Sequence, residues 1–374
     1  MGLQIRRARP DDAEAIARLN ARLRAGGVDT TVYPPDVVPA VQPDEPRESY
    51  YVVADGDEIR GSVYLRRSRL WMSDRSIPVG WIKYPVAESL VERRYAGVPA
   101  AMIMHLQREL PTLLAVGMGG LQGQFAKLLQ ALRWSGAVVP TYVLPADPLV
   151  VLTELPQLAS RPRIRRAASL LRQCGAGPIA RGAFRAWSAM RGAGTRSGIR
   201  VSRHSHPDDG WDALFHQLRG SYPAIADRSR RTVAWAMPSS APGVGFWTVE
   251  RRGQRLGWFA AQQFDFWRAR HRPYGALRVG MLHDMLADPT NASTVVTAAV
   301  RTLIEGGAQL LVANHSAPEW RPAFRAAGFL EAPPSFACLA SPALASALAE
   351  VGLTPAQLYV TRGDDGVMNP EVLE

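Results

Sequence analysis

The sequence is poor in cysteine and lysine, and it has no long apolar run. Its two cysteines, Cys174 and Cys338, are too few for a disulfide scaffold and lack the spacing of a zinc site. No apolar stretch approaches the length that spans a bilayer, and the N-terminal residues lack the apolar core of a secretory signal. With 47% apolar and 21% charged residues, these absences predict a globular protein of the reducing cytoplasm.

Acidic residues are missing from one long segment. Residues 155–207 contain no Asp or Glu but carry 11 arginines. The chain has 44 basic and 33 acidic residues, so this segment accounts for the whole net charge of +11. Lys83 and Lys127 are the only lysines of the whole chain, and this preference for arginine indicates a GC-rich genome rather than a binding function.

Part of this basic segment is amphipathic. In the helix predicted to begin at Ile179, Trp187 and Met190 lie on one face, whereas Arg181 and Arg185 lie on the opposite face. The pattern is typical of a helix on an anionic membrane surface, and equally of a linker helix packed between two domains. The basic residues have no recognisable nucleic-acid-binding fold, so nucleic acid is not expected as a partner.

The sequence also repeats itself after about 200 residues, the kind of period that marks internal duplication. A Pro-Asp-Asp motif at 10–12, followed by an amphipathic helix, recurs at 207–209. Strand-turn-strand segments follow, with Gly61 in the first and Gly257 in the second. The apolar run LLAV of the first half likewise recurs as LLVA. These landmarks predict a tandem duplication.

Each copy has the predicted order helix, loop, strand, hairpin, strand, helix, strand, helix. Alternation and aromatic enrichment predict strands at 50–55, 59–71 and 77–86, and the apolar spacing predicts helices near 97–110 and 122–134. The fold class is therefore α/β, with two tandem domains that each have a mixed, mostly antiparallel sheet flanked by helices. The predicted boundaries are 1–150 and 200–345 for the domains, 151–199 for a basic helical linker and 346–374 for a C-terminal tail.

The stretch RRYAGVPA at 93–100 follows the last of these strands and opens the next helix. Together with the order of elements, it resembles the GNAT acyltransferase superfamily, in which an R/Q-x-x-G-x-G/A loop binds the pyrophosphate of acetyl-CoA at a helix N-terminus. Pro99 stands where the second small residue of that motif belongs, and it has no N–H to donate. The resemblance implies that acetyl-CoA or another acyl-CoA is bound by Arg94, Ala96, Gly97, Val98 and Ala100.

The resemblance also implies positions for catalytic groups. GNAT enzymes often place a general base just past the fourth strand, where this chain has Glu88. His283 and Asp284 occupy the equivalent strand of the second copy, and adjacent strand residues point to opposite faces, so one of them is expected to face a cleft. The structural alternatives are a solvated loop acid and a hydrogen-bonded core histidine. The tyrosine acid of many GNAT enzymes is replaced by Leu129 and Phe324.

A glycine-rich stretch, GMGGLQG at 117–123, has the spacing GxGxxxG and no acidic partner on a following strand. It predicts a tight strand-to-helix turn rather than a dinucleotide site. No histidine pair has the spacing of metal ligands, so no metal is expected. The sequence also has no nucleophile elbow of the kind that α/β-hydrolases use.

These observations predict transfer of an acetyl or acyl group from a CoA thioester to an amine-bearing acceptor, with the first copy binding the thioester. The basic segment favours an acidic or lipid-linked acceptor, such as a glycan intermediate. One alternative is a Fem-type aminoacyl transferase that acts on a cell-wall precursor. Another is a degenerate GNAT-like pair that serves as a binding or scaffold protein. The expected location is the cytoplasm, peripheral to the inner face of the membrane if the basic segment binds lipid.

Overall fold

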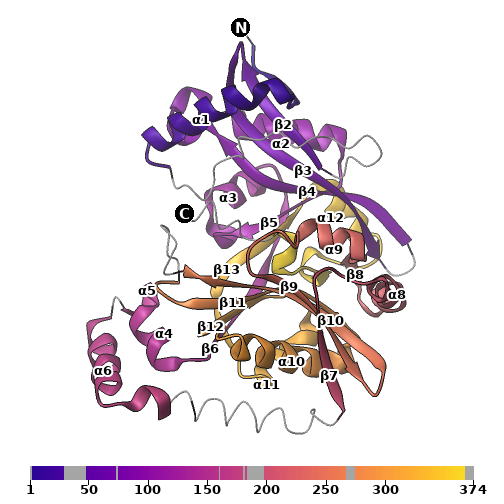
Figure 1. The fold of residues 1–374 in the computed structure, drawn as a ribbon. Helices are drawn as coiled ribbons and strands as arrows, with labels where there is room; N and C mark the ends of the chain where they lie inside the picture. The colour runs from indigo at the N-terminus through magenta and orange to yellow at the C-terminus, as the bar shows by residue number, and fades with distance from the viewer. Residues whose placement is uncertain are drawn as a thin grey trace. The chain divides into compact units, whose positions relative to one another are not determined.

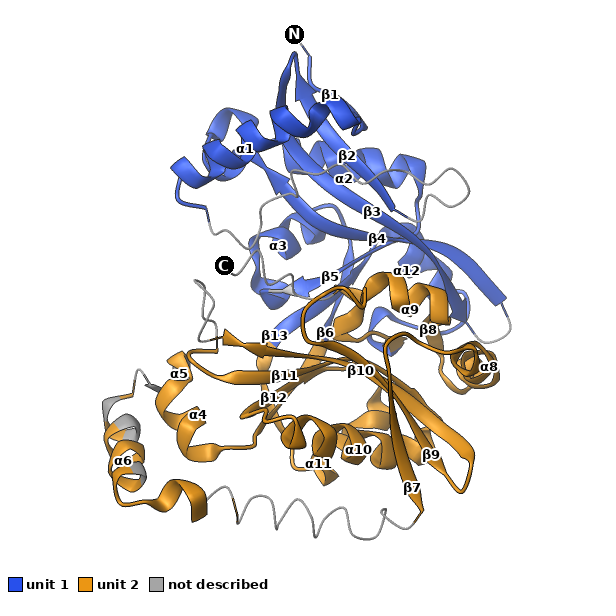
Figure 2. Ribbon diagram, viewed as in Figure 1, with its two compact units in different colours: residues 1–138, 335–357 blue, residues 139–334, 358–374 orange. Residues whose placement is uncertain are grey.

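The computed structural model describes residues 2–28, 48–72, 75–159, 161–179, 182, 198–266 and 274–366. The chain divides into two compact units (Figure 2). Unit 1 comprises residues 1–138 and 335–357, and unit 2 comprises residues 139–334 and 358–374. Each unit therefore contains a segment from the other half of the sequence.

Unit 1 contains a sheet in which only β4 and β5 run parallel (Figure 1). Its strands, in spatial order, are β1 (Gln4–Arg7), β2 (Glu48–Asp55), β3 (Glu58–Met72), β4 (Arg75–Ala87), β5 (Leu113–Met118) and residues 335–340 of β13 (Leu330–Ala340). The final strand thus comes from the C-terminal half of the chain.

Helices cover both faces of this sheet, because successive strand residues point to opposite sides. Tyr50 and Val52 pack with α1 (Ala13–Ala25) on one face. Tyr51 and Val53 pack with α2 (Val98–Glu109) and α3 (Gln124–Ala131) on the other. The helix α12 (Pro342–Ala349) follows β13, and its N-cap Ser341 accepts a hydrogen bond from the amide of Leu113 at 2.9 Å.

Unit 2 has the corresponding sheet, again with a single parallel pair, β11 and β12. Its strands, in spatial order, are residues 139–145 of β6 (Ser135–Pro145), β12 (Leu310–Asn314), β11 (Arg278–Ala287), β10 (Gln254–Asp265), β9 (Val244–Arg251) and β7 (Ile199–His204). A short parallel pair is formed by β8 (Ala224–Ala226) and β14 (Leu358–Tyr359).

The helices of unit 2 fall into an early group and a late group. The first consists of α4 (Pro148–Glu154), α5 (Pro156–Ala159) and α6 (Pro162–Gln173). The second consists of α8 (Asp209–Leu218), α9 (Arg230–Ala236), α10 (Ala292–Glu305) and α11 (Arg321–Ala326). Helix α8 is anchored by Trp211, which stacks on Trp258 of β10 with ring centroids 4.1 Å apart.

The two glycines that the sequence repeat pairs have the same structural role. A Cβ at Gly61 in β3 would lie 2.9 Å from Val98 of α2, and one at Gly257 in β10 would lie 2.7 Å from Val295 of α10. In each unit a helix therefore approaches the hairpin strand too closely for any side chain. The two glycines thus occupy matching positions in the two sheets.

The structure confirms the mixed α/β fold class and the predicted strands, which are β2, β3 and β4. The helix predicted near 122–134 is shorter, since its first turn is the 3₁₀ helix η5 (Gly120–Gln122) and α3 ends at Ala131. The glycine-rich stretch is a tight turn, with Gly119 and Gly120 at φ values of 98° and 61°. The sequence did not predict the exchange of two strands between the units, in which β6 pairs with β12 in unit 2 and β13 pairs with β5 in unit 1. Most of the predicted amphipathic helix, including Trp187, lies outside the described residues.

Candidate functional site

The parallel strands of unit 1 diverge at their carboxyl ends. β4 and β5 pair from Gly80 and Leu113 as far as Ile82 and Ala115, and then each continues without pairing to the other. A Cβ added at Gly117, near the end of β5, would have no atom within 4 Å. Ligands often bind beyond the carboxyl ends of parallel strands, so this divergence is a candidate binding groove.

A β-bulge occurs in β4 at this divergence. Ser62 of β3 pairs with Val86, whereas Tyr64 pairs with Lys83, so β4 carries one extra residue here. Tyr84 has a φ of 48° and its side chain is 44% exposed. A left-handed backbone is strained for an aromatic residue, and such strain concentrates at functional sites. The bulge therefore marks a second candidate element of the site.

Ionisable side chains surround the bulge. Tyr64 stacks on Tyr50 with centroids 4.2 Å apart and meets Tyr84 edge-on at 6.3 Å. Burial raises the pKa of the Tyr64 phenol. Burial also raises the pKa of the Glu48 carboxyl at the start of β2, although the charge of Lys83 opposes this rise.

The predicted cofactor residues lie at the start of α2, which follows the carboxyl end of β4. The chain passes through η3 (Glu88–Leu90) and η4 (Arg93–Tyr95) before Gly97, the N-cap of α2. Ala96 and Gly97 are exposed, Val98 is buried and Ala100 is half-buried. The first turn of a helix has amides without intrahelical acceptors and the positive end of the helix dipole. This geometry suits an anion, although Pro99 supplies no donor.

Arg94 lies directly before this helix start. Its side chain is exposed, and its guanidinium carbon is 4.9 Å from the ring centroid of Tyr95. On the same ring, Arg60 lies at 4.8 Å. The ring of the buried Tyr95 thus contacts the guanidinium of Arg94 close to the start of α2.

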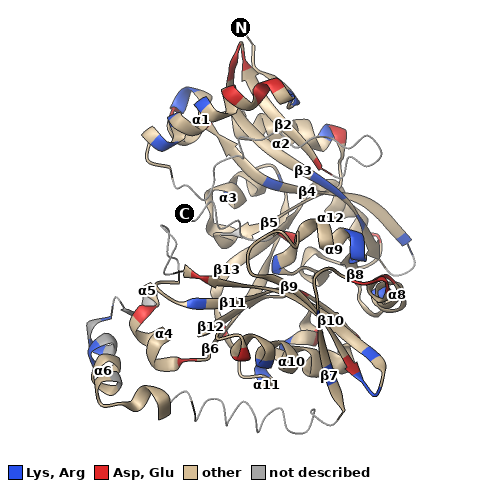
Figure 3. Ribbon diagram, viewed as in Figure 1, with Lys and Arg blue, Asp and Glu red and all other residues tan. Residues whose placement is uncertain are grey.

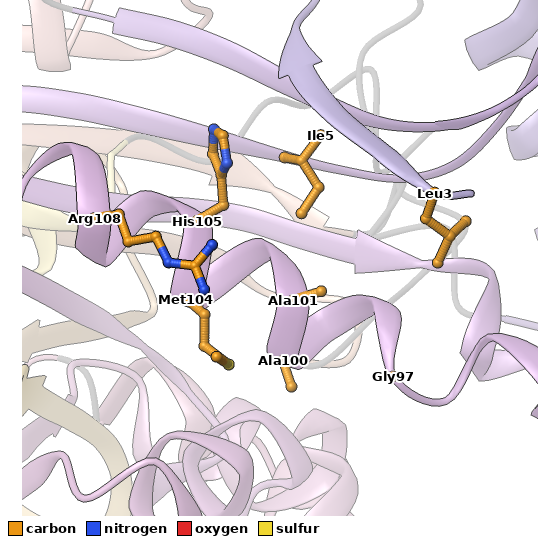
Figure 4. A pocket seen from close by; sticks show the side chains of 8 residues that line it. All are labelled: Leu3, Ile5, Gly97, Ala100, Ala101, Met104, His105 and Arg108. Carbon is orange, nitrogen blue, oxygen red and sulfur yellow. The ribbon is translucent and has the colours of Figure 1, made fainter.

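A pocket of about 450 Å³ adjoins the same helix, between β1 and α2 (Figure 4). Gly97 and Ala100 line it, together with Ile5 of β1. Further along α2, His105 and Arg108 also line it, so a cationic side chain lies beside a mainly apolar wall. Two of the residues predicted to bind the cofactor therefore line a pocket.

Glu88 occupies a different environment from the one expected of a general base. Its side chain is buried, and its two oxygens accept hydrogen bonds from Arg22 of α1 at 2.7 Å and from Arg60 of β3 at 2.9 Å. An amine would have to displace a guanidinium to reach the carboxylate. We therefore assign Glu88 to holding α1 against β3.

In unit 2 the strands β11 and β12 diverge in the same way, but the chain itself occupies the divergence. They pair as far as Leu282 and Ala313, after which His315 forms a bridge to Thr361. The amide of Ser316 donates to the carbonyl of Val360 at 2.9 Å. Residues that follow β14 thus lie at the end of β12.

Asp284 belongs to a buried charge network in this region. It forms an ion pair with Arg228, whose Nε lies 2.8 Å from its carboxylate, and it accepts a hydrogen bond from the Thr361 hydroxyl at 3.1 Å, while Asp364 accepts one from Arg228 at 2.6 Å. Burial raises the pKa of the Asp284 carboxyl, and the positive charge of Arg228 opposes that rise. Since Asp284 is buried, the expectation that one residue of the His283–Asp284 pair faces an open cleft needs correction.

His283 is the extra residue of a bulge in β11, because Ala260 pairs with Asp284 and Ala261 with Leu282. Its side chain is 1% exposed, and its Nε2 lies 3.1 Å from the amide oxygen of Gln262. Burial lowers the pKa of His283 to about 3, so the ring is neutral at physiological pH. These contacts are those of a buried core histidine.

Sequence reasoning missed Tyr84, Glu48 and the C-terminal residues near Asp284. Pro85 was the available signal for the bulge, because proline inside a central strand is found at bulges. Leu129 and Phe324, which replace the expected tyrosine acids, are both buried, and Phe324 stacks on Tyr142 with centroids 4.2 Å apart. No three His, Cys, Asp or Glu side chains of the described residues are grouped to hold a metal ion.

Comparisons with known proteins bear on the fold. No family model matches the sequence, and no curated protein matches it. Similar solved structures include a GCN5-related N-acetyltransferase from Anabaena variabilis, at 9% identity and a TM-score of 0.54 over 93% of this chain and 74% of that one. Another is the N-myristoyltransferase of Saccharomyces cerevisiae with bound myristoyl-CoA, at 10% identity and 0.54 over 91% and 82%. A probable N-acyltransferase from Enterococcus faecalis matches at 7% and 0.52 over 90% and 72%.

These likenesses define the class of fold, which is that of the GNAT-type acyltransferases, as the sequence predicted. The matches extend over nine-tenths of the chain and thus include both units.

Proposed function

We propose that the protein transfers an acyl group from a CoA thioester to an amine acceptor, and that unit 1 binds the thioester. The observation that carries this proposal is the open divergence of β4 and β5 beside the start of α2. A groove for a linear chain and a helix N-terminus for phosphates are the two features that a CoA thioester requires. The fold shared with acetyl- and myristoyltransferases supports the proposal.

The reaction has a simple balance. The amine nitrogen attacks the thioester carbonyl carbon, the carbon–sulfur bond breaks, and the amine loses a proton while CoA leaves as its thiol. The ionisable side chains nearest to the β4 bulge are Glu48 and the tyrosines Tyr64 and Tyr84. Since neither unit has the usual tyrosine acid, alignment of the two reactants supplies a large part of the rate enhancement.

Reversal of the charge at Arg94 tests the site. Arg94→Glu is expected to weaken CoA binding about threefold to tenfold at low salt, because it places a negative charge beside the phosphates, and this difference should shrink as salt rises. Isothermal titration calorimetry measures both affinities. Arg301→Glu, on the exposed side of α10 in unit 2, is the matched control and should bind CoA like the wild type. A wild-type protein with no affinity for CoA would refute the proposal.

The identity of the bound ligand separates this proposal from its alternatives. Mass spectrometry of ligands that copurify with the protein should find CoA or an acyl-CoA. An aminoacyl-tRNA in place of CoA would favour the Fem-type transferase. A glycan or lipid-linked intermediate bound without any turnover of acyl-CoA would favour a binding or scaffold protein.

We also propose that the basic segment contacts an anionic membrane surface. In α6, Leu170 and Leu171 are 61% and 50% exposed, and Arg163 and Arg166 of the same helix are also exposed. Figure 3 shows basic but no acidic residues on α6. None of the described helices combines the length and apolar character needed to cross a bilayer. Exposed leucines next to arginines suit the surface of an anionic bilayer.

Removal of the apolar contact should weaken this association. The double change Leu170→Ser and Leu171→Ser is expected to reduce co-sedimentation with anionic vesicles several-fold, while the salt dependence, which the arginines supply at about 1 kcal/mol each, is retained. Leu330→Ser alters an equally exposed leucine outside the segment and should have no effect. Equal recovery of the wild type with neutral and anionic vesicles would contradict the proposal.

A further inference from the structure

The residues from the start of β14 onward contact both diverging strands of unit 2. The Tyr359 hydroxyl donates to the carbonyl of Met285 in β11. Beyond the end of β12, the amide of Val360 donates to the Ser316 hydroxyl at 2.7 Å. Leu358, Tyr359, Val360 and Thr361 are all buried. We refer to this segment, Leu358–Asp364, as the C-terminal strap.

The polar side chains of the strap are satisfied by groups from the body of unit 2. Asp364 accepts from Arg228, and Arg362 donates to the Asn314 side chain at 3.0 Å. Arg228 is buried and pairs with two carboxylates, Asp284 of β11 and Asp364 of the strap. Removal of one partner from a buried ion-pair network is strongly unfavourable. The strap therefore supplies one of the two carboxylates that this buried arginine contacts.

A comparison with unit 1 shows which position the strap fills. In unit 1 the bulge residue Tyr84 is exposed and Gly117 borders open space. In unit 2 the bulge residue His283 is buried, and a Cβ at Gly363 would lie only 3.1 Å from its carbonyl oxygen. The strap packs where the first unit is open.

The helix starts of the two units are alike. In unit 2 the short 3₁₀ helix η9 (Pro289–Asn291) leads into α10, and the Asp288 side chain caps η9 by accepting from the Thr290 amide at 2.9 Å. In unit 1 the Glu92 side chain caps η4 by accepting from the Arg94 amide. The units therefore differ at the strand divergence, which is open in unit 1 and filled in unit 2.

We propose that the C-terminal strap is an intramolecular ligand of unit 2. The groove between β11 and β12 accepts an extended peptide whose carboxylate pairs with Arg228, and the strap occupies this groove in place of an acyl-CoA. The inference goes beyond the proposed function, because it depends only on unit 2 and holds whether or not unit 1 binds CoA.

Addition of the strap as a separate peptide tests the proposal. A chain truncated after Gln357 should bind a synthetic peptide of residues 358–366 in calorimetry, whereas the full-length chain should bind it at least 100-fold more weakly because its groove is filled. The Asp364→Ala peptide should bind the truncated chain at least 100-fold more weakly than the native peptide. A chain truncated after Gly366 retains the strap and is the matched control. Equal affinity of the two peptides, or no binding of either to a folded truncated chain, would overturn the proposal.

A second measurement serves if the truncated chain does not fold. Hydrogen exchange of the full-length protein should show protected amides at Val360 and Thr361, which donate to Ser316 and Asp364. Asp364→Asn should raise their exchange rates at least tenfold, and Glu350→Gln, directly after α12 in unit 1, should leave them unchanged. Unchanged rates in Asp364→Asn would show that Arg228 does not hold the strap and would overturn the proposal.

Discussion

Replacement of Arg228 by methionine is expected to lower the free energy of unfolding by about 3–5 kcal/mol, the usual cost of removing one partner of a buried ion pair. Methionine retains much of the arginine volume, so the loss comes from charge rather than from a cavity. Asp284 and Asp364, both buried, would remain without the cation that they share. Chemical denaturation, followed by circular dichroism, measures this change.

Two further variants decide the cause of that loss. Arg278→Met breaks an ion pair with Asp265 in the same unit, but this arginine side chain is 45% exposed, so the change should be within about 1 kcal/mol. Arg228→Met combined with Asp284→Asn and Asp364→Asn should recover part of the lost stability, since the uncompensated charges are removed. A loss below 1 kcal/mol in Arg228→Met, or no recovery in the triple variant, would contradict the charge argument.

Gly117→Leu is expected to reduce the affinity of unit 1 for acyl-CoA about 100-fold, or roughly 2.7 kcal/mol, without loss of stability. The open space around this glycine lets a side chain fit without displacing protein atoms. The same side chain would fill the groove that we assign to the thioester. Calorimetry with a non-hydrolysable acyl-CoA analogue and thermal unfolding measure the two quantities.

A graded series strengthens this test. Affinity should fall progressively from Gly117→Ala to Gly117→Val and Gly117→Leu, because each step fills more of the groove. Gly220→Leu changes another glycine with open space, in unit 2, and should leave affinity unchanged. Undiminished affinity in Gly117→Leu would place the thioester elsewhere.

The fold was predictable where the determining pattern is local. Alternation fixes β2 because Tyr50 and Tyr51 must face different helices, and a close helix approach fixes Gly61 and Gly257. The site was predictable at Gly97, since a helix start follows from nearby residues. The ion pairs of Glu88 were not, because Arg22 and Arg60 come from other elements and meet it only in the folded unit.

The same limit explains His283 and Asp284. Polar residues in an apolar strand predict either a cleft or buried partners, and the choice depends on Arg228 and Thr361, which are distant in sequence. Tyr84 lay within reach of sequence reasoning through Pro85. Its strained backbone nevertheless depends on the register between β3 and β4, which no single strand specifies.

The exchange of β6 and β13 affects how the chain can be made. The sheet of unit 1 is complete only when residues 335–340 pair with β5, and Ser341 then also contacts Pro111 and Leu113. A ribosome that adds about 5–20 residues per second needs roughly 10–40 seconds to synthesise the chain between these partners. During synthesis the first unit therefore exposes one side of β5 until almost the whole protein has emerged. Neither half of the sequence therefore contains all the strands of one unit's sheet.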